Sequence, residues 1–212
     1  MRLVCIADTH KKHRDLEVPD GDVLIHAGDI GLENRKHQKM LWDFHMWIES
    51  LPHEHKIVIA GNHDWYISDN LYISQKILHD SCNFLSDSEV IIDGVKFYGS
   101  PWQPDFGRWA FNLPRGSPLL KKWLMIPDDT DVLITHGPPR DVLDRVYYSN
   151  QHVGCDDLWD RIVFIRPKVH VFGHIHEGYG MDRLTCPSTI FVNASVVNEF
   201  YQLVNKPIVI DI

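Results

Sequence analysis

Five short segments of this chain carry side chains that can bind metal ions. They are Asp8-Thr9-His10, Gly28-Asp29, Gly61-Asn62-His63-Asp64, Thr135-His136-Gly137 and Gly173-His174-Ile175-His176. A mixed set of oxygen and nitrogen donors without sulfur suits manganese, iron, zinc, cobalt or nickel. The set is large enough for two adjacent divalent ions, and the predicted ligands are Asp8, His10, Asp29, Asn62, His136, His174 and His176.

Two cations about 3.5 to 4 Å apart need an anion between them, and a carboxylate with a hydroxide can supply it. Asp29 is the predicted bridging ligand. His174 and His176 alternate along the chain, so in an extended segment their side chains point to opposite faces. Gly173 permits a turn of the backbone, and one imidazole can then serve each ion.

A dinuclear site of this kind suits hydrolysis. A hydroxide held between the ions forms near neutral pH and can attack a substrate in line with the leaving oxygen. The leaving oxygen then needs a proton. His63, next to the predicted ligand Asn62, is the predicted general acid, and Asp64 is expected to orient its ring and favour its protonated form.

The ligands follow short apolar runs, which are typical of buried strands in an α/β protein. The predicted strands are Leu3–Ala7, Val23–Ala27, Lys56–Ala60, Val90–Ile92, Val95–Gly99, Val132–Thr135, Val169–Phe172, Ile190–Val192 and Ile208–Ile210. In open α/β sheets, ligands gather beyond the carboxyl ends of the strands. The sequences DVLIHAG at 22–28 and DVLITHG at 131–137 resemble each other, which indicates two similar halves facing each other.

Helical spacing of apolar residues predicts a helix over Arg35–Leu51, with Asn34 as its N-cap and Pro52 as its stop. A second helix is predicted over Asp156–Ile165, before Pro167. A third is predicted over Leu71–His79.

Length and composition predict one domain over residues 1–212. No apolar run approaches the ~18 residues of a membrane helix, and the first apolar run is too short for a secretory signal. The four cysteines form no metal-binding or redox pair, which favours a soluble, cytoplasmic protein. A formal charge of −8 argues against stable binding of nucleic acid.

A stretch rich in aromatic residues and proline, 101–116, offers a wall on which a base could stack. The alternative is a hydrophobic cluster that pins a long loop. The candidate substrate contacts are His13, Trp102, Arg108, Trp109, Asn112 and Arg115, with His13 equally interpretable as a loop residue in solvent. Eight further histidines are interpreted as structural: His26, His37, His45, His53, His55, His79, His152 and His170.

Taken together, the five segments resemble the calcineurin-like metallophosphoesterases, whose motifs D-x-H, GD, GNHD or GNHE, an isolated His and GH-x-H appear here in order. The resemblance implies a four-layer αββα sandwich of two mixed β-sheets flanked by helices. It places Asp8, His10, Asp29 and His176 on one metal ion, and Asp29, Asn62, His136 and His174 on the other. Many relatives carry Asp where this chain has Leu32, a position that is not a metal ligand.

Segments outside the ligands, such as Gly99 to Pro104 and Trp109 to Gly116, look closest to class III cyclic nucleotide phosphodiesterases and the metallophosphoesterase-domain proteins of animals. This second resemblance implies hydrolysis of a small nucleotide ester, a 2′,3′- or 3′,5′-cyclic nucleotide, with manganese as the first candidate metal. The alternatives are a phosphomonoesterase acting on protein or nucleotide, and a non-catalytic metal-binding scaffold. Relatives also suggest a homodimer.

Overall fold

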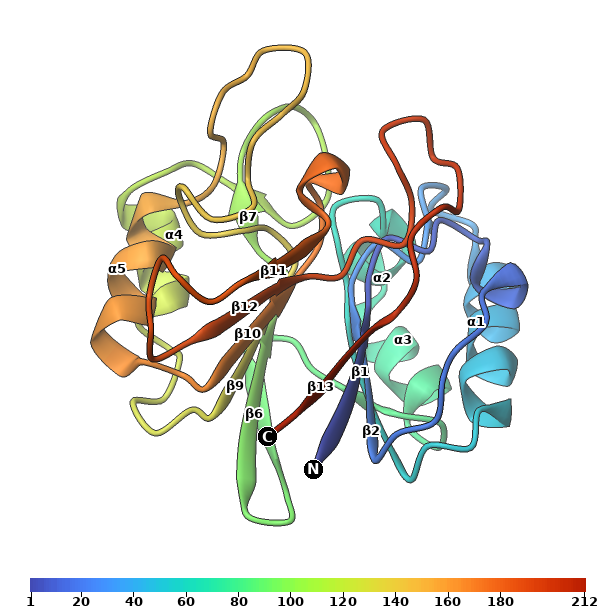
Figure 1. Ribbon diagram of the computed structural model, residues 1–212. Helices are drawn as coiled ribbons and strands as arrows, with labels where there is room; N and C mark the ends of the chain where they lie inside the picture. Colours follow the sequence, from blue (N-terminus) through green and yellow to red (C-terminus); the bar gives the residue numbers. More distant parts are fainter.

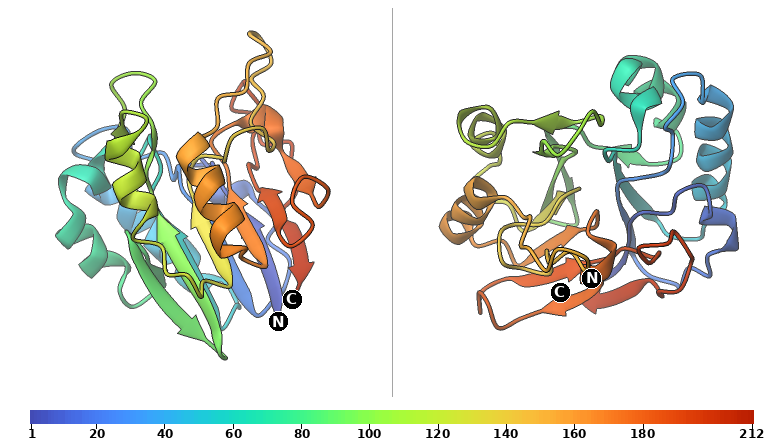
Figure 2. Two further views of the ribbon diagram at one scale, coloured as in Figure 1. Left: turned by 90° about the vertical axis from the view of Figure 1, so that its left-hand side faces the viewer. Right: turned by 90° about the horizontal axis from the view of Figure 1, so that it is seen from above.

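Two β-sheets pack face to face in this protein, and helices cover the outer side of each sheet, as Figure 1 shows. The computed structural model describes residues 1–212. The view from above in Figure 2 shows the layers in the order helices, sheet, sheet, helices. The predicted four-layer α/β sandwich is therefore confirmed.

The first sheet has the strand order β13-β1-β2-β3-β4, in which β1 to β4 run parallel and β13 runs antiparallel to β1. The strands are β1 (Arg2–Ile6), β2 (Val23–Ala27), β3 (His55–Ile59), β4 (Asn83–Phe84) and β13 (Ile208–Asp211).

The second sheet has the order β11-β12-β10-β9-β6-β5, with four central parallel strands and an antiparallel strand at each edge. The strands are β5 (Ser88–Ile92), β6 (Val95–Ser100), β9 (Val132–Thr135), β10 (Val169–Phe172), β11 (Gly180–Asp182) and β12 (Ile190–Asn193). The short strands β7 (Gln103–Pro104) and β8 (Asn112–Leu113) pair separately.

The helices divide between the two outer faces (Figure 1). Those on the first sheet are α1 (Gln38–Ser50), α2 (Trp65–Asp69) and α3 (Leu71–Leu78), and those on the second are α4 (Ser117–Trp123) and α5 (Asp156–Ile165). Two single turns of 3₁₀-helix are η1 (His13–Asp15) and η2 (His176–Gly178). None of these helices is long and apolar enough to span a membrane.

The strands read as continuous apolar runs because both faces of each sheet are buried. In β1, Leu3 and Cys5 point into the core between the sheets, whereas Val4 and Ile6 pack under the helices of the first sheet. In β9, Val132 points into the central core and Leu133 packs under α4 and α5. The alternation of side chains along each strand therefore builds three apolar layers from two sheets.

Most predicted elements lie within one or two residues of the observed ones, and the range of α5 is the predicted one. The predicted N-cap of α1 is wrong, because the helix begins at Gln38 and the Asn34 side chain instead accepts a hydrogen bond from the Lys36 amide. The short elements β4, β7, β8, β11, α2 and α4 were not predicted. They have too few residues to show a period in sequence.

The central strands of both sheets end at the same edge of the sandwich and present the predicted ligands there. Asp8 and Asp29 follow β1 and β2 in the first sheet, and His136 and His174 follow β9 and β10 in the second. The Ala7 amide donates to the Ala194 carbonyl, so the end of β1 is tied to the segment that follows β12. This link holds the two sets of strand ends together across the sandwich.

Candidate metal centre

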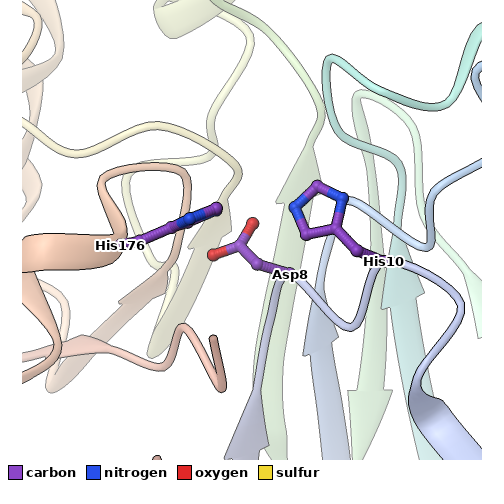
Figure 3. Close-up of side chains that lie close together, drawn as sticks. All are labelled: Asp8, His10 and His176. Carbon is purple, nitrogen blue, oxygen red and sulfur yellow. The ribbon is translucent and has the colours of Figure 1, made fainter. Parts of the chain in front are cut away.

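The predicted ligands meet at this edge in two overlapping groups. One group contains Asp8, His10 and His176, and the other contains Asp8, Asp29 and His136; within each group the possible ligand atoms lie within 4.8 Å of one another. Figure 3 shows the Asp8 carboxylate between the rings of His10 and His176, which are far apart in the sequence. His174 lies beside the second group, its ring centroid 5.0 Å from that of His136.

The orientation of His136 calls for a positive charge at Nε2, which a metal ion supplies or, in its absence, a second proton, since Asp29 outweighs burial and raises the pKa of His136 to about 9. Its Nδ1 lies 3.0 Å from the Ala27 carbonyl oxygen and must donate to it, which leaves Nε2 as an acceptor in the neutral ring. This Nε2 faces two oxygens, 2.9 Å from Asn62 Oδ1 and 3.4 Å from Asp29 Oδ1. Adjacent ligands of one octahedral metal, each about 2.1 Å from it, lie about 3 Å apart. The three atoms are therefore spaced as ligands of one ion.

Asp29 presents its two oxygens to different histidines. Oδ1 faces His136, while Oδ2 lies 3.7 Å from His10 Nε2. Burial would raise the pKa of this carboxyl, but the neighbouring imidazoles, His136 foremost, hold it well below its usual range. A carboxylate between two imidazole groups has the position that the predicted bridging ligand needs.

Several buried polar atoms here have no hydrogen-bond partner in the protein. Asp8 Oδ1 and both ring nitrogens of His10 are in this state, although Asp8 Oδ2 accepts a hydrogen bond from the His174 amide. His176 donates from Nδ1 to the Asn198 carbonyl, which leaves its Nε2 lone pair available. Buried polar groups are normally paired, so this cluster fits a pair of divalent ions in donor type and in orientation.

The ligand loops have an unusual backbone. Asp8, His10, Asp29 and His174 all have positive φ, between 41° and 69°, a conformation that side chains other than glycine seldom adopt. The predicted turn at Gly173 is made instead by His174, with φ of 69°. Gly173 serves a different purpose, because a Cβ there would lie 2.5 Å from Asp8 Oδ2.

His63 lies at the rim of the cluster, and its acidic partner is Glu33. The His63 Nδ1 is 3.6 Å from a Glu33 oxygen, and Lys11 holds Glu33 through a 2.6 Å ion pair. Burial lowers the pKa of His63, but the charges of Glu33, Asp29 and Asp64 outweigh it and raise the pKa above its ordinary value. Its Nε2 forms no hydrogen bond within the chain and is free to donate outward.

The predicted role of Asp64 as the group that orients His63 needs correction. The Asp64 carboxylate accepts hydrogen bonds from the backbone amides of Gly61, Ile30, Gly31 and Leu32. It therefore ties the Gly61–Asp64 turn to the loop that carries Asp29, and its effect on His63 is only that of a nearby charge. Burial raises the pKa of Asp64 to about 6, since desolvation and the charge of Asp29 disfavour its ionised form.

Aromatic rings enclose His63. The Trp109 ring stacks against it with centroids 4.2 Å apart and an interplanar angle of 32°. Tyr201, on the loop after β12, meets His10 and His176 edge-on at 4.7 and 5.3 Å. Trp109, one of the candidate substrate contacts in the 101–116 stretch, therefore lies beside His63 at the candidate metal centre.

Two other predicted substrate contacts are structural. His13 is only 1% exposed and donates from Nε2 to Asp43, which removes it from any phosphate. Trp102 donates its indole N–H to Asp87 and lies under the Lys122 ammonium, away from the metal ligands. For Trp102 the packing interpretation is correct, whereas His13 is neither a substrate contact nor a loop residue in solvent.

The remaining three candidates differ. The Arg115 guanidinium donates to the carbonyls of Val153 and Gly154, so it holds the 153–154 loop at 2.6 and 2.7 Å. Asn112 is bonded to Gln103 and Asp105. Arg108 is exposed and forms no salt bridge, which leaves it available to an anion in solvent.

Two buried histidines support the ligand loops through threonine hydroxyls. His26 accepts a hydrogen bond from the Gly28 amide at Nδ1, so its Nε2 donates to Thr9, between the ligands Asp8 and His10. His170 Nε2 donates to Thr135, whose hydroxyl is directed to the Gly137 carbonyl on the other side of His136. Each sheet thus carries one Thr–His hydrogen bond directly beneath a ligand, and both histidines are structural as predicted.

Burial lowers the pKa of His26 and of His170 to about 3. In the unfolded chain these histidines are protonated below about pH 6.5, whereas in the folded chain they stay neutral down to about pH 3. The free energy of unfolding therefore has its full value above about pH 6.5 and falls as the pH drops toward 3. His170→Gln should reduce this loss by up to about 1.4 kcal/mol per pH unit below pH 6. Denaturant unfolding of the metal-free protein at pH 7 and pH 5 measures this loss, and His79→Gln, at an exposed histidine, is the control. If the parent protein, His170→Gln and His79→Gln all lose the same free energy of unfolding between the two pH values, the expectation is contradicted.

Three residues of the site were not predicted from the sequence: Glu33, Tyr201 and Asn198. Glu33 had a signal, because it stands one residue beyond the position where relatives carry Asp and this chain has Leu32. Tyr201 and Asn198 follow β12 without any motif, and only the folded chain brings them to His10 and His176.

A fold of two facing mixed sheets, with oxygen and imidazole ligands at their shared edge, defines a metallophosphoesterase-type domain. The sequence profile of the calcineurin-like phosphoesterase family matches residues 1–178, and the chain belongs to this family. Members generally bind two divalent metal ions, and the clusters described above are the candidate ligands here.

The chain is 45% identical over 237 residues to metallophosphoesterase domain-containing protein 1 of Homo sapiens, covering 100% of this chain and 71% of that protein. The protein of the same name from Mus musculus has the same identity and coverage. The crystal structure of TT1561 from Thermus thermophilus is similar with a TM-score of 0.61 at 13% identity, covering 91% of this chain and 88% of that one. That last likeness supports the fold alone.

Proposed function

We propose that this chain is a dinuclear metal-dependent phosphodiesterase that hydrolyses small nucleotide esters, 2′,3′- or 3′,5′-cyclic nucleotides. The observation that carries the proposal is the placement of His136 Nε2 against two oxygens while its Nδ1 is occupied by the Ala27 carbonyl. Nε2 needs a positive charge there, from a proton or from a metal ion, and membership of the calcineurin-like phosphoesterase family supports a pair of metal ions.

In this proposal Asp8, His10, Asp29 and His176 hold one ion, and Asp29, Asn62, His136 and His174 hold the other. Two bound divalent cations supply charge that lowers the pKa of a water nucleophile and stabilises the negative charge of the transition state. The residues of the chain orient these groups: Ala27 and Asn198 carbonyls direct His136 and His176. Manganese is the first metal to test.

His63 is the proposed general acid for the leaving oxygen. Glu33 lies 3.6 Å from Nδ1 and its charge favours the protonated imidazolium, so Nε2 carries the proton that is transferred. Trp109 stacked on one face of the ring limits its rotation. Glu33 therefore takes the orienting role expected of Asp64.

The test is hydrolysis of bis-p-nitrophenyl phosphate by protein stripped of metal and reloaded with Mn²⁺, with metal content measured on the same sample. About two ions per chain with turnover above that of the stripped protein are expected. If the protein hydrolyses p-nitrophenyl phosphate but not the bis ester, it is a phosphomonoesterase and not a phosphodiesterase. If it binds two ions and hydrolyses neither ester, the non-catalytic metal-binding scaffold is favoured.

We also propose a cytoplasmic location and a small-molecule substrate. Four free cysteines, Cys5, Cys82, Cys155 and Cys186, support a reducing compartment. The charge of −8 supports a small substrate over a nucleic acid chain. A homodimer is part of the proposal, and light scattering of the purified protein tests it.

A further inference from the structure

A pocket of about 340 Å³ opens beside the proposed metal centre. His174 and Gly137, the residue after His136, form the wall toward the metal ligands. Phe106, Val146 and Val153 also line the pocket. A group attached to a phosphate at the metal ions can enter this pocket, and its size is at the lower end of the range for small-molecule sites.

The pocket carries negative charge, which is unusual beside a place where a phosphate group is proposed to bind. Two carboxylates, Asp105 and Glu177, line it, and Arg115 is the only lysine or arginine in its wall. The Arg115 guanidinium is already bonded to the Val153 and Gly154 carbonyls and lies 3.5 Å from Asp156. The pocket is therefore acidic, with no cation free to meet a second anion.

Each carboxylate has one oxygen available to a ligand. Asp105 Oδ1 accepts hydrogen bonds from Gly107 and Asn112, and Glu177 Oε1 accepts one from the Tyr147 amide. Asp105 Oδ2 and Glu177 Oε2 form no hydrogen bond within the chain. An ionised carboxylate only accepts hydrogen bonds, so both exposed oxygens, which otherwise accept from water, can accept from donors on a group that occupies the pocket.

The remaining walls suit a flat ring. Pro104, Pro138 and Ile175 add apolar surface, and the Phe106 ring is 55% exposed with its centroid 5.1 Å from that of His174. A quaternary ammonium group is usually held by several aromatic faces, whereas Phe106 is the single aromatic residue in this lining. The combination of apolar walls and hydrogen-bond acceptors favours a base with donor groups on its edge.

We propose that this pocket binds the base of the substrate and that Asp105 and Glu177 select a base with an N–H donor edge, guanine in preference to bases without it. This inference rests on the proposed nucleotide phosphodiesterase function. Guanine presents N1–H and an exocyclic amino group side by side, and a carboxylate accepts both. The same acidic lining repels substrates with further phosphates, such as oligonucleotides.

The experiment compares guanosine and inosine 2′,3′-cyclic phosphates, which differ only in the exocyclic amino group, as substrates of the Mn²⁺-loaded protein. We expect kcat/KM to favour guanosine by about 10- to 100-fold, the effect of a hydrogen bond to a charged group. In the double variant Asp105→Asn and Glu177→Gln this ratio should fall to within about threefold. Exposed Asp80→Asn, remote from the pocket, should keep the full ratio.

A second readout is binding of GMP and IMP by calorimetry, which needs no turnover and should show the same preference and the same loss. A ratio near one in the unchanged protein, or an unchanged ratio in the double variant, would overturn the inference. A third comparison uses p-nitrophenyl phosphocholine and its analogue with a neutral 3,3-dimethylbutyl group. If the protein prefers the phosphocholine ester and the double variant loses that preference, the pocket binds a cationic group instead of a base. Failure of the proposed function itself is distinct, because bis-p-nitrophenyl phosphate would then not be hydrolysed either.

Discussion

Asp29→Asn is expected to lose both metal ions and to reduce phosphodiester hydrolysis by more than about 100-fold. Substituting a residue that only hydrogen-bonds to a metal ligand can already cost up to about 100-fold in metal affinity or activity, and Asp29 is itself a proposed ligand. The substitution keeps the side-chain volume but removes the negative charge that faces His136 and His10 at 3.4 and 3.7 Å. Metal analysis after Mn²⁺ reloading, together with hydrolysis of bis-p-nitrophenyl phosphate, measures both effects.

The fold should survive this substitution. Asp29 is 1% exposed, and its carboxylate is stabilised in the folded chain by His136, which holds its pKa well below the usual range. Removing that charge should therefore lower the melting temperature of the metal-free protein modestly while the cooperative unfolding transition remains. Asp20→Asn, at an exposed acidic residue outside the site, serves as the control. A variant that still binds two ions would refute the bridging role of Asp29.

His63→Ala is expected to slow hydrolysis of a cyclic nucleotide by about 10² to 10⁴-fold, the usual contribution of a general acid. A nucleoside alkoxide is a strong base and leaves slowly without a proton, whereas p-nitrophenolate is a stable anion. The loss on bis-p-nitrophenyl phosphate should therefore be much smaller. Steady-state kinetics on both substrates, with metal content held at two ions per chain, measures the difference.

Glu33→Gln provides the matched test of orientation. It removes the charge 3.6 Å from His63 Nδ1 but keeps the side-chain length, so we expect a smaller loss with the same dependence on the leaving group. His79→Ala, at a side chain that is 82% exposed, should leave both rates unchanged. Equal losses on the two substrates in His63→Ala would show that His63 positions the site and does not donate the proton.

The elements of the core were predictable because their signals are local. A run such as Val132–Thr135 carries its strand character in four consecutive residues, and its observed range is the predicted one. The helix α5 likewise shows its apolar period before Pro167. By contrast, β7 and β8 have two residues each and exist only because the 101–116 stretch folds back on itself.

The substrate side of the site was less predictable because hydrogen bonds decided it. Arg115 and Trp102 have side chains that could contact phosphate or base, but both are hydrogen-bonded within the chain. Arg115 donates to the Gly154 carbonyl, and Trp102 donates to Asp87. His13 similarly lies against α1, bonded to Asp43. Residue type alone does not reveal which donors are already occupied.

The sequence by itself determined the kind of site, because carboxylate, amide and imidazole residues follow apolar strands whose carboxyl ends must share an edge. It did not determine which acid serves His63. The side chains of Asp64 and Glu33 are directed by local turns: Asp64 turns inward to four backbone amides, and Glu33 reaches His63. The acidity of the neighbouring pocket also arose only on folding, because Asp105 follows β7 and Glu177 lies in η2, and the two-sheet sandwich brings both to one pocket.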